Sequence, residues 1–114
     1  MKDCLFCKIA SGVIQAQLAH QDDQCVAFHD LNPQSPTHIL VIPRRHLSSI
    51  AECEPADEPL LGHLQLVAAN LARKLGFEKS GYRMVLNTGP DGGQTVQHIH
   101  VHLLAGRALQ WPPG

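Results

Sequence analysis

The chain has 114 residues, with 9 Lys and Arg against 10 Asp and Glu and a hydrophobic fraction of 44%. This length predicts a single domain over residues 1–114, and the apolar content is enough for a packed core. The formal charge of -1 removes the usual electrostatic basis for nucleic-acid or membrane-surface binding, and no apolar run approaches the roughly 20 residues of a membrane span. Because the sequence starts without an export signal, we expect a cytoplasmic protein with reduced cysteines.

The first half of the chain predicts one short helix and two strands. Asp3 suits the N-cap of a helix that ends near Ala10, before Gly12. Residues 24–29 are β-prone and are followed by a turn-forming Asp-Leu-Asn-Pro sequence. Residues 38–42 form a continuous apolar run of strand length, closed by Pro43.

The clearest helix runs from about Asp57 to Leu75. Pro59 suits its first turn, and Gly76 suits the stop after its last turn. His63 lies near the edge of the apolar stripe and is interpreted as an ordinary helix residue, in preference to a ligand. Apolar residues at three- and four-residue spacing predict one buried stripe: Leu60, Leu61, Leu64, Val67, Ala68, Leu71 and Leu75.

The last third of the chain predicts two further strands. Residues 82–87 alternate like a strand, residues 88–93 are rich in turn formers, and residues 95–104 return as a longer strand. Strands joined by turns, with one substantial helix, indicate an antiparallel sheet with that helix packed on one face. The predicted fold class is therefore α+β.

A row of histidines occupies alternate positions of the final predicted strand. Residues two apart on a strand share a face, so three imidazoles should point away from the core. Imidazoles in such a row can bind a metal ion, or they can attack and bind phosphate, because the neutral ring is a nucleophile at physiological pH. A merely solvated polar face is the simplest alternative. The row consists of His98, His100 and His102, alternating with apolar Ile99, Val101 and Leu103.

The sequence around the row favours phosphate over a catalytic metal. Asn87 ends the preceding predicted strand, and a glycine-rich loop over residues 89–93 follows it. Backbone amides in such loops can bind oxyanions, although an ordinary hairpin turn would also explain the glycines. Gln94 and Thr95 add neutral hydrogen-bonding groups beside the row, and no carboxylate is adjacent in sequence.

Residues 97–104 resemble the His-x-His-x-His-x-x signature of the histidine triad (HIT) superfamily. The likeness is greater to the Hint branch, the purine nucleotide-binding phosphoramidases, than to the dinucleoside-polyphosphate hydrolases. It implies a HIT-like fold with an antiparallel sheet of about five strands, one main helix and a short N-terminal helix. The likeness extends over nearly the whole chain, through residues 29–34, 36–43, 60–63, 81–84, 92–94 and 111–114.

The resemblance also implies a catalytic scheme. His100 would attack the α-phosphorus and form a nucleotidyl-histidine, which water then cleaves. His38 and His102 would contact the phosphate, while His98 would support His100 through its main-chain carbonyl and assist the leaving group. Asn87 corresponds to a phosphate-pocket residue of the family.

Further residues are assigned to phosphate and nucleoside binding. Thr95 stands where well-known Hint members carry serine and is expected on the leaving-group side, with Gln94 beside it. Asp30 suits either a turn cap or a ribose contact, and the resemblance favours ribose. Phe28 is assigned to the core. The remaining nucleoside-binding residues are expected to be His29, Leu31, Phe6, Ile9 and Ile14.

The implied activity is cleavage of the P–N bond in purine nucleoside 5′-phosphoramidates. Alternatives are a dinucleoside-polyphosphate hydrolase, a nucleotidyl transferase, or a nucleotide- or zinc-dependent interaction protein. Trp111 lies in a proline-rich tail, and the resemblance implies a homodimer in which this tail reaches the partner's active site. The alternative is that Trp111 closes over its own domain. No organic cofactor is expected.

Cys4 and Cys7 have the spacing of half a zinc site. His46 and His98 are candidates for the other two ligands, since some histidine triad relatives that retain this pair bind structural zinc with that set. Two reduced cysteines on a helix are the alternative, and a redox role is less expected because no βαβ pattern surrounds the pair. Zinc on the His98 ring would remove its leaving-group role.

Overall fold

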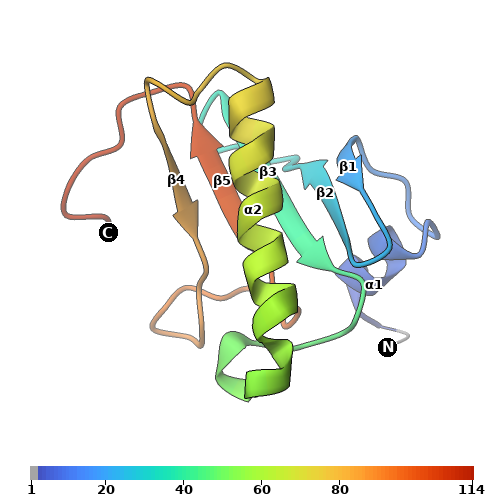
Figure 1. Ribbon diagram of the computed structural model, residues 1–114. Coiled ribbons are helices and arrows are strands. Elements are labelled where there is room, and N and C mark those ends of the chain that lie inside the picture. Colours follow the sequence, from blue (N-terminus) through green and yellow to red (C-terminus); the bar gives the residue numbers. More distant parts are fainter. Residues whose placement is uncertain (1–2) are drawn as a thin grey trace.

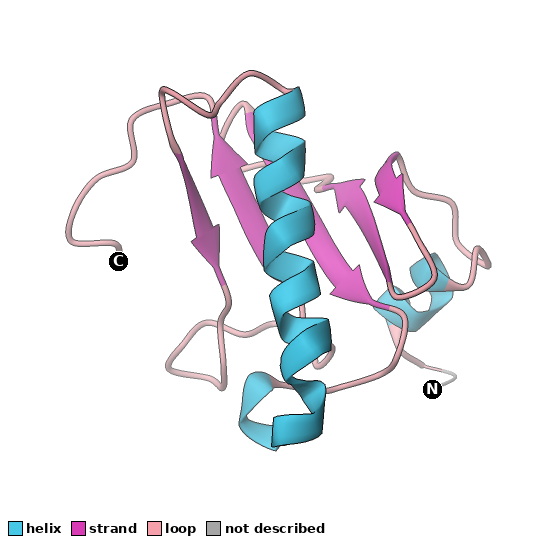
Figure 2. Ribbon diagram, viewed as in Figure 1, coloured by secondary structure: helices cyan, strands magenta, loops and turns pink. Residues whose placement is uncertain are grey.

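The computed structural model describes residues 3–114; the first two residues of the predicted domain lie outside this part. Five antiparallel strands form one sheet in the order β1-β2-β3-β5-β4. Helix α2 (Glu58–Lys74) crosses one face of the sheet (Figures 1 and 2). The short helix α1 (Leu5–Ala10), near the N-terminus, packs on the opposite face. The strands are β1 (Leu18–Gln21), β2 (Cys25–His29), β3 (Thr37–Pro43), β4 (Tyr82–Val85) and β5 (Val101–Ala105), and two 3-10 turns (Ile50–Glu52 and Pro55–Asp57) precede α2. The predicted α+β class, with five strands and two helices, is confirmed.

Each face of the sheet has its own apolar cluster. Strand β3 contributes to both, because Ile39 and Val41 pack toward α2 while Leu40 and Ile42 pack toward α1. On the α2 side the same cluster contains Ile99, Val101 and Leu103, all buried. The histidines that alternate with them therefore lie on the α1 side.

The strand predicted over residues 95–104 is wrong at its beginning, because regular pairing starts only at Val101. Pro43 at the end of β3 has no N–H, so it cannot continue the ladder. Its carbonyl instead accepts a hydrogen bond from the His98 ring at 2.8 Å. Strand β4 also ends earlier than predicted, at Val85, and the edge strand β1 was not predicted at all.

Helix α1 begins one residue later than expected, with Cys4 as its N-cap in place of Asp3. The Cys4 sulfur accepts a hydrogen bond from the backbone N–H of Cys7 at 3.3 Å, which is the contact that an N-cap side chain makes. Gly12 follows with φ of +83°, a left-handed conformation that ends the helical path.

Helix α2 follows its predicted course, with two corrections. Asp57 belongs to the preceding 3-10 turn, and Leu75 at the end of the stripe is 48% exposed. Ala72, outside the predicted stripe, is buried instead. Within the described residues, α2 and the other helices lack the length and apolarity needed to cross a membrane.

Helix α2 is also tied to the β1–β2 turn by polar contacts. One carboxylate oxygen of Asp22 lies 2.7 Å from His63 Nε2 on α2 and 2.8 Å from His20 Nε2 on β1. Its other oxygen accepts backbone N–H groups of Gln24 and Cys25 at 2.7 and 2.8 Å. His63 therefore does more than an ordinary helix residue, because it links α2 to the edge of the sheet.

Candidate functional site

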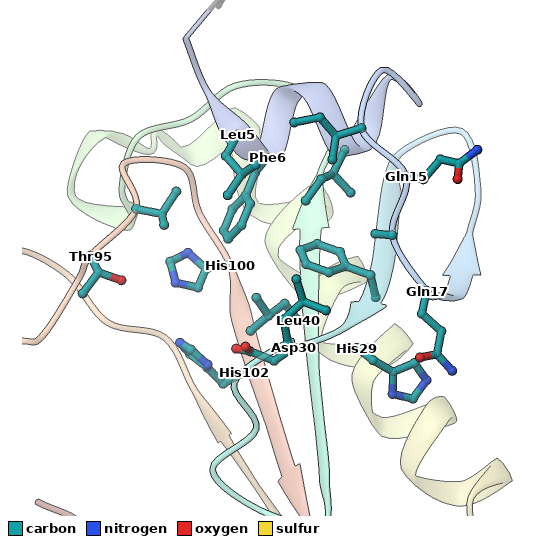
Figure 3. A pocket seen from close by; sticks show the side chains of 16 residues that line it. Leu5, Phe6, Gln15, Gln17, His29, Asp30, Leu40, Thr95, His100 and His102 are labelled. Atoms are coloured by element: carbon teal, nitrogen blue, oxygen red, sulfur yellow. The ribbon is translucent and has the colours of Figure 1, made fainter.

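A cavity of about 350 Å³ opens on the α1 side of the sheet (Figure 3). This volume falls in the range of small-molecule sites, about 300–1,000 Å³. The cavity brings together nine residues that the sequence assigned to catalysis or nucleotide binding: Phe6, Ile9, Ile14, His29, Asp30, Leu31, Thr95, His100 and His102.

The hydrogen bonds of His100 determine which of its ring nitrogens faces the cavity as an acceptor. Its Nδ1 lies 2.8 Å from the carbonyl oxygen of His98, and a carbonyl only accepts, so Nδ1 carries the proton. The neutral ring then keeps an unprotonated Nε2. His100 is only 5% exposed and lines the cavity, so this lone pair is available to a ligand there.

The same reasoning makes His102 a hydrogen-bond donor, whereas His100 is an acceptor. The backbone N–H of Gln34 donates to Nδ1 of His38 at 3.0 Å, which leaves the proton of neutral His38 on Nε2. That Nε2 lies 2.9 Å from His102 Nδ1 and donates to it. His102 must then carry its own proton on Nε2, so an N–H donor stands beside the lone pair of His100.

Burial keeps both supporting rings neutral. Burial lowers the pKa of His38, an effect that the nearby Asp30 carboxylate partly opposes. The pKa of His102 is lowered to about 4, first by burial and then by repulsion from His100 and His38. At neutral pH these rings therefore act as fixed hydrogen-bonding groups without a charge.

Asp30 makes a turn-capping contact with one carboxylate oxygen, while its other oxygen is placed near His38. Its Oδ1 accepts the backbone N–H of Asn32 at 2.8 Å, which is a turn-capping contact. Its Oδ2 lies 3.5 Å from His38 Nε2, and the residue also lines the cavity. In Figure 3 the Asp30 carboxylate lies beside His102, within reach of a ligand in the same space.

Aromatic and aliphatic side chains form the walls of the cavity. Phe6 meets Phe28 edge-on with ring centroids 5.6 Å apart, and meets His100 in the same way at 5.1 Å. Phe28, assigned to the core, thus belongs to the core and to the cavity wall. Leu31 stands at the cavity with 99% of its surface exposed.

Two predicted phosphate-pocket residues lie away from this cavity. Asn87 lines a separate small hollow with His38 and His102. The Gln94 amide bonds to the backbone: it donates to the carbonyls of Ser48 and Val96 at 2.6 and 3.1 Å, and it accepts the N–H of Gly89 at 3.0 Å. Gln94 therefore holds the loop that carries Thr95, whose hydroxyl points toward His100 in Figure 3.

Sequence reasoning missed several residues that line the cavity. Leu40 was placed on a strand, but a continuously apolar strand does not indicate which side chains face a ligand. Residues 15–17 belong to an irregular segment without any motif. The missed lining residues, apart from Phe28, are Leu5, Gln15, Ala16, Gln17, Leu40 and Val96.

A second cluster, the Cys/His cluster, consists of Cys4, Cys7, His46 and His98, whose ligand atoms all lie within 4.8 Å of one another. Three of the sulfur–nitrogen distances are 3.3–3.5 Å, and the two Nδ1 atoms are 3.2 Å apart. A tetrahedral zinc ion, with bonds of about 2.3 Å to sulfur and 2.0–2.1 Å to nitrogen, has edges of about 3.3–3.8 Å between its ligands. The donor set and its spacing therefore fit a zinc ion.

The ring of His98 is already oriented for that role. Its Nε2–H donates to the carbonyl of Pro43, so its Nδ1 is unprotonated and faces the two cysteines. Metal-binding histidines commonly have such a partner on the other ring nitrogen. This orientation leaves the His98 carbonyl free to hold His100.

The fold and the cavity define an α+β protein with a row of histidines on one face of its sheet. Residues 11–109 match the HIT domain family. The chain is 49% identical to a HIT-like protein of Synechococcus elongatus over 113 residues, or 99% of this chain and 98% of the relative. The chain therefore belongs to the HIT domain family.

Two solved structures are similar over nearly their whole length. The crystal structure of a HIT family hydrolase from Legionella pneumophila Philadelphia 1 gives a TM-score of 0.97 at 46% identity, covering 98% of this chain and 100% of that one. A histidine triad protein from Clostridium difficile gives 0.94 at 42% identity, covering 96% of each chain. These likenesses identify the fold as the HIT fold.

Proposed function

We propose that this protein is a nucleotide-binding hydrolase of the Hint type, which cleaves the P–N bond of purine nucleoside 5′-phosphoramidates. The observation that carries the proposal is the pairing of an acceptor nitrogen on His100 with a donor N–H on His102 in one cavity. A nucleophile with an adjacent phosphate-oxygen donor is what phosphoryl transfer through a covalent intermediate requires. The name of the Legionella relative, a HIT family hydrolase, also supports hydrolysis.

The reaction has two displacements. His100 Nε2 attacks the α-phosphorus, a P–N bond to the imidazole forms, and the bond to the amine breaks as the amine takes a proton from solvent at the exposed Thr95 side. Water then attacks the same phosphorus and gives up a proton to solvent, the bond to His100 breaks, and the nucleoside monophosphate leaves with the water oxygen. The N–H of His102 donates to a phosphate oxygen in both steps.

The remainder of the cavity suits a nucleoside. Asp30 Oδ2 can accept a hydrogen bond from a ribose hydroxyl. Phe6, Phe28 and the aliphatic side chains beside them offer flat apolar surfaces to a purine, and Leu31 would be covered by it. An apolar surface favours a purine for its area without distinguishing adenine from guanine.

Zinc belongs to the proposal as a structural ion, held by the Cys/His cluster. Two thiolates and two imidazoles form a closed tetrahedral site, which supplies folding stability and leaves no open position for a substrate. In this arrangement the His98 side chain takes no part in proton transfer to the leaving group. The thiols must remain reduced, as they do in the cytoplasm.

We also propose a homodimer. Trp111 is 81% exposed within one chain, so it does not close over its own domain. The tail that carries it extends away from the edge strand β4 (Figure 1), in a position to reach a second copy. Light scattering with size-exclusion chromatography tests this proposal, and a monomer at micromolar concentration would contradict it.

The decisive experiment traps the covalent intermediate. Brief reaction with adenosine 5′-phosphoramidate, acid quenching and peptide mass spectrometry should place adenylate on His100. The variant His100→Ala should carry no adenylate and lose about 10³-fold or more in kcat. His63→Ala removes an imidazole from the other face of the sheet and serves as the matched control. Adenylate on another histidine, or activity of His100→Ala equal to wild type, would overturn the proposal; faster turnover of a diadenosine polyphosphate would reassign the substrate class.

A further inference from the structure

Helix α1 connects the Cys/His cluster with the nucleotide cavity. At its N-terminal end it carries Cys4 and Cys7, two members of the cluster. Its Leu5, Phe6 and Ile9 side chains form one wall of the cavity, here called the α1 wall. Figure 3 shows Leu5 and Phe6 extending from this helix toward His100.

Helix α1 needs external anchors to hold that wall in place. It has only six residues, whereas isolated helices shorter than about 12–15 residues are marginal in water. At its C-terminal end the Arg44 guanidinium donates to the Ala10 carbonyl at 2.6 Å. At its N-terminal end the anchor is the Cys/His cluster, which joins the helix to His46 and His98.

His98 provides a second connection between the two sites. Its ring is completely buried and belongs to the cluster through Nδ1. Its own carbonyl, two residues before the nucleophile, accepts the Nδ1–H of His100. One residue therefore belongs to both sites: the ring of His98 is part of the cluster, and its carbonyl orients the ring of His100.

We propose that metal binding at the Cys/His cluster and nucleotide binding in the cavity are positively coupled, through the α1 wall and His98. The inference rests on the proposed function, since it requires that the cavity bind a nucleotide. Zinc bound to the four ligands holds the α1 wall and the His98 carbonyl in the conformation that the nucleotide contacts. By thermodynamic linkage, the nucleotide must then hold zinc more tightly by the same factor.

The coupling predicts a change in affinity of about 10-fold, within the usual range of about 5- to 150-fold for linked sites. Calorimetry with AMP should give a dissociation constant about 10-fold higher for chelator-stripped protein than for zinc-loaded protein. Equal AMP affinity in both forms would overturn the coupling alone. If zinc-loaded protein does not bind AMP, the proposed function fails and the coupling fails with it.

A reciprocal measurement starts from zinc-loaded protein. In equilibrium competition with a colorimetric chelator, saturating AMP should protect the bound zinc by lowering its dissociation constant about 10-fold, and an unchanged constant would contradict the coupling. Phe6→Leu shortens the α1 wall while leaving all four ligands in place, so it should reduce this protection. Cys53→Ser removes a thiol outside the cluster and should preserve it.

Discussion

Residues 98–103 contribute side chains to both faces of the sheet, and these side chains have different roles on the two faces. From residue 98 to residue 103, odd-numbered side chains pack against α2 in an entirely apolar cluster, whereas even-numbered ones build the cavity and the Cys/His cluster. On the α2 side, the contribution of a residue depends on the volume it fills. On the other side it depends on which ring nitrogen carries a proton. The contrast predicts that substitutions one residue apart affect either stability or chemistry.

After His100→Ala, the largest effect is expected from His102→Ala. This change removes the N–H donor beside His100, so kcat for adenosine 5′-phosphoramidate should fall by about 10²- to 10³-fold, as for the loss of one transition-state donor elsewhere. Steady-state kinetics measures the fall, and urea unfolding should show little loss of stability. A kcat within threefold of wild type would show that His102 is not the donor.

Leu103→Ala tests the neighbouring position on the other face. Leu103 is fully buried against α2, so truncation should lower the free energy of unfolding by about 3 kcal/mol through lost burial and a residual cavity. Urea denaturation measures this change, while kcat/KM should stay within twofold. Leu66→Ala on the exposed surface of α2 is the control, with a change of about 0.5 kcal/mol or less.

Acid should destabilise the protein through the cavity face. In the folded state the pKa values of His38 and His102 lie below their usual value near 6.5, with His102 at about 4. Below pH 6.5 the unfolded chain therefore binds more protons, and stability falls as pH decreases toward 4. We expect a loss on the order of 2 kcal/mol, measured by urea unfolding at pH 7 and pH 4.5. His102→Gln should flatten this dependence; an equally steep profile would contradict the assignment.

The smallest effect is expected at the polar contact on the α2 side. His63→Ala removes one imidazole from the Asp22 carboxylate and should lower the free energy of unfolding by about 1 kcal/mol, leaving kcat unchanged. Thermal unfolding gives the first quantity and steady-state kinetics the second. A tenfold loss of kcat would instead show that α2 and the cavity are coupled.

Periodicity predicted the elements in which burial repeats over many residues. The stripe on α2 spans about five turns, and the alternation of Ile99, Val101 and Leu103 located the core face of β5. Strand β1 has four residues, pairs only with β2 and contains a bulge, so it leaves almost no pattern in the sequence. The beginning of β5 was misplaced because its partner strand, which ends at Pro43, is far away in the chain.

For the site, the sequence indicated many of the residues but not their protonation or their hydrogen-bond partners. Alternation identified the histidine row, but ring protonation follows from contacts with Pro43, Gln34 and the His98 carbonyl, which no local pattern encodes. The spacing of Cys4 and Cys7 indicated half of the cluster, and the likeness to histidine triad proteins supplied the other half. Gln94 was expected to face phosphate, but the path of its loop lets backbone groups satisfy its amide.

The backbone around His98 is free of regular pairing on its β4 side. In an interior strand, a fully paired ladder engages every carbonyl with one neighbour or the other. The His38 carbonyl faces β2, so odd-numbered residues of β5 pair with β3 and even-numbered residues face β4. Because pairing between β4 and β5 begins only at His102, the His98 carbonyl is left to accept the Nδ1–H of His100.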